Sequence, residues 1–166
     1  RISHSKSLVT FGERQEGEPV PYARNAAKYV CSPANAYKNH PKVERNLAAL
    51  ETYGNTSPLN KVERKGSKVG VAYQYAKDVF PEDTSFLKLG LTYPLPMELI
   101  REFAATVETL YVIEELEPFM EEQIRAAGIS CIGKELTGRV YELNPQLLQA
   151  RLFGAKAETV ELPVQA

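Results

Sequence analysis

Length, composition and charge indicate one ordinary globular domain and exclude several classes of function. The 166 residues are 43% hydrophobic and 25% charged, and the formal net charge of -1 offers no overall attraction to nucleic acid or to an anionic membrane. No apolar run approaches the roughly 20 residues that span a bilayer. From the charge and from this observation together, we expect neither a nucleic-acid partner nor a membrane partner.

The cysteines and the first residue indicate the setting of the chain. Cys31 and Cys131 form no CxxC pair, which disfavours a disulfide framework or zinc site and favours a reducing, cytoplasmic location. Both thiols are expected to be buried as small apolar side chains. The chain begins with Arg1 rather than Met, and we therefore expect a piece of a longer protein.

The first third of the chain contains many breakers and few alternating apolar runs. We expect residues 1–58 to form an irregular N-terminal arm with one helix. That helix is predicted over Lys42–Tyr53, because Asn39-His40-Pro41 is typical of a helix start and Gly54 of a helix end. Shorter elements are also predicted: a strand over Ser7–Phe11, one or two helical turns within Tyr22–Val30, and a bend over Ser32–Ala36.

Residues 59–154 alternate between strand-like and helix-like patterns, which predicts an α/β domain followed by a mobile tail over 155–166. The order of elements predicts a three-layer α/β/α arrangement around a mixed, mostly parallel five-stranded sheet. The strands are expected at Asn60–Arg64, Lys68–Ala72, Ser85–Leu91, Thr109–Ile113 and Ser130–Ile132. Helices are expected from Ala72 to Phe80, after Pro96, after Pro118 and after Asn144-Pro145, and Gly133–Gly138 is expected to be loop.

In three of these predicted helices, apolar residues recur at helical intervals and should face the core. They are Leu99, Ile100, Phe103 and Val107 after Pro96, Phe119, Met120, Ile124 and Ala127 after Pro118, and Leu147, Leu148 and Leu152 after Pro145. Gly128 and Gly154 are natural helix ends.

Acidic residues gather where the fourth predicted strand ends, at Glu114, Glu115, Glu117, Glu121 and Glu122. Open α/β sheets bind ligands at the carboxyl ends of their strands, so Glu114 or Glu115 could contact a ligand or a partner. Alternatively, Glu117, Glu121 and Glu122 complement the positive end of the following helix and face water. The sequence leaves both interpretations open.

A second loop, Thr92-Tyr93-Pro94-Leu95-Pro96, also follows the carboxyl end of a strand, and two prolines stiffen it. Stiff loops at strand ends suit recognition as well as plain turns. Other chemistry has little support, because His4 and His40 have no second ligand at metal-binding spacing and neither GxGxxG nor GxxxxGK[ST] is present. An independent hydrolase would lack a nucleophile–base pair.

Several longer strings together resemble one family, the alpha subunit of indolepyruvate:ferredoxin oxidoreductase. They are RISHSKS (Arg1–Ser7), YVCSPANA (Tyr29–Ala36), SPLNKV (Ser57–Val62), VAYQY (Val71–Tyr75), LKLGLTYPLP (Leu87–Pro96), LYVIEELEPFMEEQ (Leu110–Gln123) and IGKEL (Ile132–Leu136). The resemblance covers nearly the whole chain, and its two longest strings are far more specific than a three-residue motif.

The resemblance implies a thiamine-diphosphate enzyme with iron–sulfur clusters, whose alpha subunit works with a beta subunit. Such an enzyme oxidises indolepyruvate and other arylpyruvates, forms aryl-acetyl-CoA and CO2, and passes electrons to ferredoxin. The strings resemble the middle domain of that subunit, which lies between the pyrimidine-binding and diphosphate-binding domains. This domain is like the transketolase C-terminal domain and has one antiparallel edge strand, for which Asn60–Arg64 is the candidate.

The resemblance implies no catalytic or cofactor-binding residue in this chain. The family's GDG…N motif for the diphosphate and Mg, and its cysteine runs for [4Fe-4S] clusters, are absent from the sequence. No catalytic, cofactor-binding or metal-binding residue is therefore carried over, and these cofactors would belong to the longer parent subunit. Family members also have several more residues between the strings that correspond to KVG and VAYQY. We therefore expect a stretch to be absent between Gly70 and Val71, a junction that is also short for a βα loop.

The expected function is that of a structural and interface domain that is inactive alone. The candidate interface consists of the two carboxyl-end loops, with Thr92, Tyr93, Pro94 and Leu95 in one and Glu114, Glu115, Leu116 and Glu117 in the other. Its expected partners are the flanking domains and the beta subunit, with ferredoxin and coenzyme A reached through the parent. The alternative is a free-standing α/β module that binds a small ligand between the same two loops.

Overall fold

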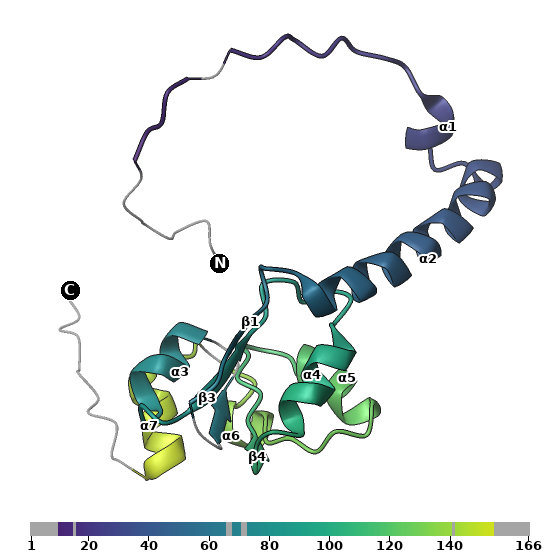
Figure 1. The fold of residues 1–166 in the computed structure, drawn as a ribbon. Coiled ribbons are helices and arrows are strands. Elements are labelled where there is room, and N and C mark those ends of the chain that lie inside the picture. The colour runs from purple at the N-terminus through teal and green to yellow at the C-terminus, as the bar shows by residue number, and fades with distance from the viewer. Residues whose placement is uncertain (1–9, 15, 66–67, 71–72, 141, 155–166) are drawn as a thin grey trace, which may run out of the picture. The chain divides into compact units, whose positions relative to one another are not determined.

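The computed structural model describes residues 10–14, 16–65, 68–70, 73–140 and 142–154 (Figure 1). By its internal contacts the chain divides into two units, Arg1–Asn39 and His40–Ala166. The predicted tail at 155–166 lies outside the described residues. So does the predicted strand at Ser7–Phe11, apart from Thr10 and Phe11, which form no regular structure.

In the first unit, the short helix α1 (Ala26–Tyr29) lies within the segment for which helical turns are predicted. The side chain of Asn25 caps this helix by accepting a hydrogen bond from a backbone N–H of its first turn at 3.0 Å. The amide of Asn39 donates to the carbonyl oxygen of Ala27 at 3.0 Å.

Helix α2 (Pro33–Thr56) is longer than the predicted helix and shows that the predicted bend over Ser32–Ala36 is wrong. The hydroxyl of Ser32 accepts a hydrogen bond from the N–H of Asn35 at 3.4 Å, and Pro33 occupies the first turn, where its missing N–H costs nothing. Ser32-Pro33 thus provides the same start signal as Asn39-His40-Pro41, and the helix continues through Pro41. Gly54 lies inside the helix rather than at its end.

The second unit contains a four-stranded sheet in the order β1-β3-β2-β4. Strand β2 is parallel to both β3 and β4, whereas β1 pairs with β3 in the antiparallel direction at the edge of the sheet. The antiparallel edge strand predicted at Asn60–Arg64 is therefore confirmed. The strands are β1 (Lys61–Glu63), β2 (Lys68–Gly70), β3 (Ser85–Lys88) and β4 (Thr109–Leu110).

The predicted fifth strand, Ser130–Ile132, is wrong as a strand, because within the described residues it contributes only one parallel bridge, between Tyr111 and Ile132. The N–H of Val112 donates to the carbonyl of Ile132, and the N–H of Ile132 to that of Leu110, each at 2.8 Å. The pairing stops there because helix α6 (Lys134–Thr137) begins almost at once, in the segment predicted as loop.

Helices cover both faces of the sheet, which gives three layers (Figure 1). Successive strand residues face opposite sides, so Phe86 and Leu87 belong to different cores. One core contains Leu87, Leu95, Ile100, Phe103, Leu110, Val112, Met120, Ile124 and Ile129, and the other Ala76, Phe80, Phe86, Ile113, Leu143 and Leu148. The first is covered by α4 (Met97–Ala104) and α5 (Phe119–Ala126), and the second by α3 (Tyr73–Val79) and α7 (Pro145–Phe153).

Most of the predicted inward faces of these helices are confirmed. Ile100 and Phe103 are buried in α4, and Met120 and Ile124 in α5. Phe119 is the exception, since it is 48% exposed at the first position of α5. The helix ends follow the prediction: Gly128 and Gly154 have φ of 77° and 68°, and Asn144 caps α7 by accepting from the N–H of Leu147 at 2.8 Å.

Candidate functional site

The carboxyl ends of β2, β3 and β4 lie at one edge of the sheet, because these strands are parallel. From β2 the chain passes through α3 to β3 on one side, whereas from β4 it passes through α5 to Ile132 on the other side. The direction of the connections thus changes between β2 and β4, and open α/β sheets bind ligands in the crevice at such a point. We call this side of the sheet the carboxyl edge.

The first predicted loop, Thr92–Pro96, is only partly exposed at the carboxyl edge. Thr92 and Tyr93 face solvent, and Tyr93 is 63% exposed. Pro94 follows a cis peptide bond and is half-buried, whereas Leu95 is buried in the core that α4 and α5 cover. Within this half of the candidate interface, Leu95 is therefore an anchor for the loop rather than a contact residue.

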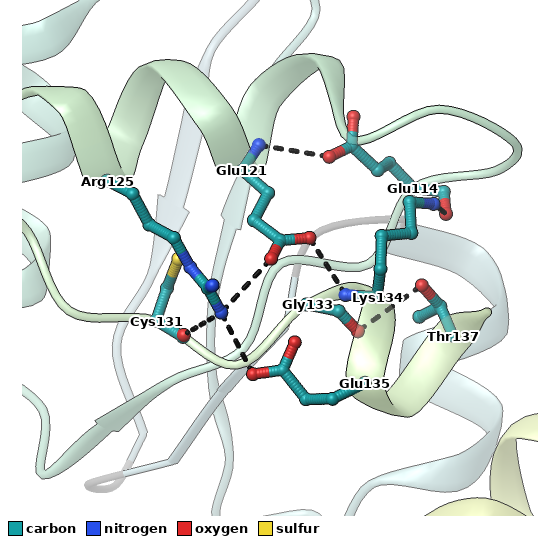
Figure 2. Close-up of polar contacts among 8 residues, drawn as sticks. All are labelled: Glu114, Glu121, Arg125, Cys131, Gly133, Lys134, Glu135 and Thr137. Carbon is teal, nitrogen blue, oxygen red and sulfur yellow. Dashed lines mark hydrogen bonds and ion pairs between the residues drawn. The ribbon is translucent and has the colours of Figure 1, made fainter. Parts of the chain in front are cut away.

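Glu114 begins the second predicted loop and is buried at the N-terminus of α5 (Figure 2). Its carboxylate accepts hydrogen bonds from the backbone N–H groups of Met120 at 2.8 Å and of Glu121 at 3.0 Å. A negative charge is favourable there because the first N–H groups of a helix have no helical partners. Lys134 Nζ donates to the carbonyl oxygen of Glu114. Glu114 is therefore a helix cap, and its two oxygens are already engaged.

Glu121 forms a second polar cluster next to Glu114, as Figure 2 shows. Its buried carboxylate accepts a hydrogen bond from the N–H of Lys134 at 2.8 Å and pairs with Arg125 at 3.0 Å. Arg125 also pairs with Glu135 at 2.9 Å. A Cβ atom on Gly133 would overlap the Glu121 carboxylate, so this close approach requires glycine. The interpretation in which Glu121 simply faces water is wrong.

Burial changes the titration of two groups in this region. The pKa of Lys134 lies below its ordinary value because the ammonium is partly desolvated, an effect that Glu114 and Glu121 oppose. Burial raises the pKa of the Cys131 thiol, and Arg125 opposes that shift. Cys131 is half-buried, but Cys31 is exposed, so the prediction that both thiols are buried is wrong for Cys31.

The three residues that follow Glu114, which are Glu115, Leu116 and Glu117, form the exposed part of the second loop. The Glu115 carboxylate accepts a hydrogen bond from the N–H of Leu143 at 3.1 Å, which connects the loop to the segment before α7. Leu116 is 44% exposed and has φ of 57°, a conformation uncommon outside glycine. Glu117 lies 3.7 Å from Arg139, and both side chains are mostly in solvent.

The first predicted loop meets the start of α5 through aromatic rings. The ring of Tyr93 lies 6.1 Å from that of Phe119, with an interplanar angle of 50°, and the two residues are 63% and 48% exposed. The prediction of an inward Phe119 missed this contact. Helical periodicity alone misplaces Phe119, because residues in the first turn of a helix can point past the core.

A cleft of about 340 Å³ opens at the carboxyl edge and is lined by residues from both sides of the β2–β4 crevice. The lining residues are Tyr73, Gln74, Lys88, Leu89, Thr92, Ile113 and Met120. Of these, only Thr92 belongs to the predicted site. A lysine that ends an apolar strand and a tyrosine that opens the preceding helix are weak signals, and the sequence does not show that they meet.

One wall of the cleft contains a hydrogen-bonded cluster. The hydroxyl of Tyr73 donates to one oxygen of Glu63, and Lys77 pairs with the other at 2.8 Å. These hydrogen bonds hold the pKa of Glu63 below its usual value, and the hydrogen bond from Lys77 has the larger effect of the two. Lys88 lies over the Tyr73 ring, with Nζ 5.3 Å from the ring centroid.

The described residues offer no metal site and no membrane-spanning helix. Among them, no three His, Cys, Asp or Glu side chains gather in a way that could hold a metal ion. His40 lies 3.3 Å from Glu44 on the exposed surface of α2, and His4 lies outside the described residues. No helix in these ranges is long and apolar enough to cross a bilayer.

Known proteins similar to this chain share one description. The indolepyruvate oxidoreductase subunits IorA of Thermococcus kodakarensis and Pyrococcus horikoshii are each 32% identical to it, over 87% and 99% of this chain. The IorA subunit of Archaeoglobus fulgidus is 31% identical over 87% of this chain. The matched stretches are 26%, 28% and 25% of these relatives, so the chain spans about a quarter of their length. No family model and no solved structure matches the chain.

The alignment with the Pyrococcus protein spans 186 positions, whereas this chain has 166 residues, so that relative contains residues without a counterpart here. The absent stretch expected between Gly70 and Val71 stays a prediction. The level of identity and its extent nevertheless lead to one conclusion. The chain is homologous, at about 30% identity over most of its length, to a portion of indolepyruvate oxidoreductase subunit IorA.

Proposed function

We propose that this chain is the middle domain of the alpha subunit of an indolepyruvate:ferredoxin oxidoreductase. The similarity to IorA over about a quarter of that subunit is the observation that carries the proposal. The antiparallel edge strand β1 agrees with a domain like the transketolase C-terminal domain. In the parent enzyme, thiamine diphosphate, Mg and [4Fe-4S] clusters oxidise arylpyruvates to aryl-acetyl-CoA and CO2 and reduce ferredoxin.

Within that enzyme, the domain supports structure and contacts rather than chemistry. The acidic residues that are best placed for acid–base work serve the fold: Glu114 caps α5, and Glu121 binds Arg125 and the Lys134 backbone. The oxygens of both carboxylates are occupied by contacts within the domain and are not free to meet a substrate. The cofactors therefore belong to other parts of the subunit.

The carboxyl-edge loops form the contact surface with the flanking domains or the beta subunit. Tyr93 and Leu116 of these loops and Phe119 at the start of α5 present large apolar side chains to solvent, and Glu117 adds charge. Thr92, Pro94 and Glu115 complete the surface, while Leu95 and Glu114 hold it from inside. Leu116 keeps an unfavourable backbone conformation while its side chain is exposed, and strain of this kind concentrates at functional positions.

The test is a substitution in the complete alpha subunit, assembled with its beta subunit. Leu116→Asp should weaken assembly or indolepyruvate-dependent ferredoxin reduction, because a charge enters an apolar contact. Phe153→Asp on α7 is the matched control, since Phe153 is 55% exposed but lies in neither loop. Equal assembly and turnover of the Leu116→Asp and wild-type enzymes would remove the interface role.

The alternative is a free-standing α/β module that binds a small ligand, and the cleft at the carboxyl edge favours it. The open reading frame that contains this chain discriminates between the two. Flanking thiamine and cysteine-cluster motifs decide for the oxidoreductase subunit, and a reading frame without them decides for the module.

A further inference from the structure

Two lysines face each other across the β1–β3 pair without a neutralising acid. Lys61 and Lys88 are direct cross-strand partners, so their side chains share one face of the sheet. Like charges in this arrangement destabilise a sheet. The carboxylate on the same face, Glu63, already binds Tyr73 and Lys77. In the part of the chain that the structure describes, no carboxylate pairs with either Lys61 or Lys88.

Lys88 lines the carboxyl-edge cleft, whose other side is apolar. Leu89 is half-buried there and Met120 is 9% exposed, Ile113 is fully buried, and Gln74 and Thr92 add uncharged polar groups. The volume of about 340 Å³ is within the range of small-molecule sites. None of the described residues that line the cleft is acidic.

We propose that this cleft binds a small organic monocarboxylate with an apolar body. The carboxylate pairs with Lys88 and relieves its repulsion with Lys61, while the apolar body contacts Leu89 and Met120. A cation would meet unneutralised lysines, and a purely inorganic anion would leave the apolar wall without a partner. The cleft shares only Thr92 with the proposed interface surface, and ligand binding to the chain and assembly of the complete enzyme are measured in separate experiments.

The two methionines of the chain provide a direct measurement, because Met120 lines the cleft and Met97 lies in α4 outside it. The experiment follows both methyl resonances in the full chain, labelled at the methionine methyl groups, during titration. Benzoate is the probe, benzamide its neutral isostere, and inorganic phosphate an anion without an apolar body. We expect benzoate to shift the Met120 resonance saturably and Met97 hardly at all, with little response to the other two compounds.

Lys88→Gln should weaken benzoate binding about tenfold or more, a factor that corresponds to 1.4 kcal/mol. Lys42→Gln on the exposed surface of α2 is the matched control and should bind like wild type. An unchanged Met97 resonance shows that each variant is folded, and Lys61→Gln is used instead if Lys88→Gln does not fold.

The proposal is overturned if millimolar benzoate produces no saturable Met120 shift, if benzamide or phosphate binds as tightly as benzoate, or if the lysine variant binds benzoate as tightly as wild type. Normal assembly of the complete enzyme alongside any of these results would leave the proposed interface intact.

Discussion

The two loops at the carboxyl edge are held in place by different means. Thr92–Pro96 is anchored by apolar burial, since Leu95 is 3% exposed and Pro96 packs close to Gly54 of α2. The loop that begins at Glu114 is anchored by polar contacts to α5 and to Lys134. Apolar anchoring depends on area removed from water, whereas polar anchoring depends on geometry and charge. The two loops should therefore respond differently to truncation and to loss of charge.

The largest effect is expected from Leu95→Ala. Removing a buried leucine side chain leaves a cavity and should lower the free energy of unfolding by about 3 kcal/mol. Chemical denaturation of the full chain measures the change, with Leu116→Ala as the control in the other loop. Because Leu116 is 44% exposed, its truncation should cost about 0.5 kcal/mol or less. Similar losses for the two variants would mean that Leu95 does not anchor the first loop.

Gly133→Ala should lower the free energy of unfolding by about 2 kcal/mol, the cost of leaving a buried polar group without its partners. The added Cβ would displace the Glu121 carboxylate from the N–H of Lys134. Gly12→Ala is the matched control, because no atom lies within 4 Å of the Cβ position there. Denaturant midpoints compare the two, and an undiminished midpoint for Gly133→Ala would show that the cluster adjusts freely.

Glu114→Gln tests the charge of the second anchor. The amide keeps the shape of the carboxylate but loses its charge at the N-terminus of α5, and we expect a loss of about 1 kcal/mol in the free energy of unfolding. Glu117→Gln removes a charge from the same loop where the side chain is 77% exposed, and it should change nothing measurable. If the two variants unfold alike, the capping geometry contributes no stability.

Glu63→Gln should have the smallest effect at neutral pH and a distinct one in acid. The pKa of Glu63 is lowered in the folded chain, so its contribution is present above the unfolded value near 4.5 and disappears as the pH falls through the lowered folded value. Wild type should therefore lose stability below about pH 4.5 more steeply than Glu63→Gln. Melting temperatures measured from pH 7 to pH 3 provide the comparison. Parallel pH profiles would indicate that the contacts with Lys77 and Tyr73 do not persist in solution.

Predictions from local patterns succeeded where one segment suffices to define the structure. The spacing of Ile100 and Phe103 defined the buried side of α4, and Asn144-Pro145 defined the start of α7. The errors arose where a local signal occurs twice or where distant segments compete. Ser32-Pro33 starts α2 before Asn39-His40-Pro41 can, and α6 begins at Lys134, directly after the single bridge of Ile132.

By itself, the sequence determined the alternation of strands and helices, the antiparallel edge strand and the positions of the two carboxyl-edge loops. These features follow from periodicity, from turn residues and from strings shared with one family. Only the tertiary structure decided that Glu114 is a buried cap, that Glu121 approaches Gly133, that Phe119 meets Tyr93 and that Lys88 lines a cleft. Each of these contacts joins residues that are separated in the chain. Their energies depend on burial and on distances that exist only after the layers have packed.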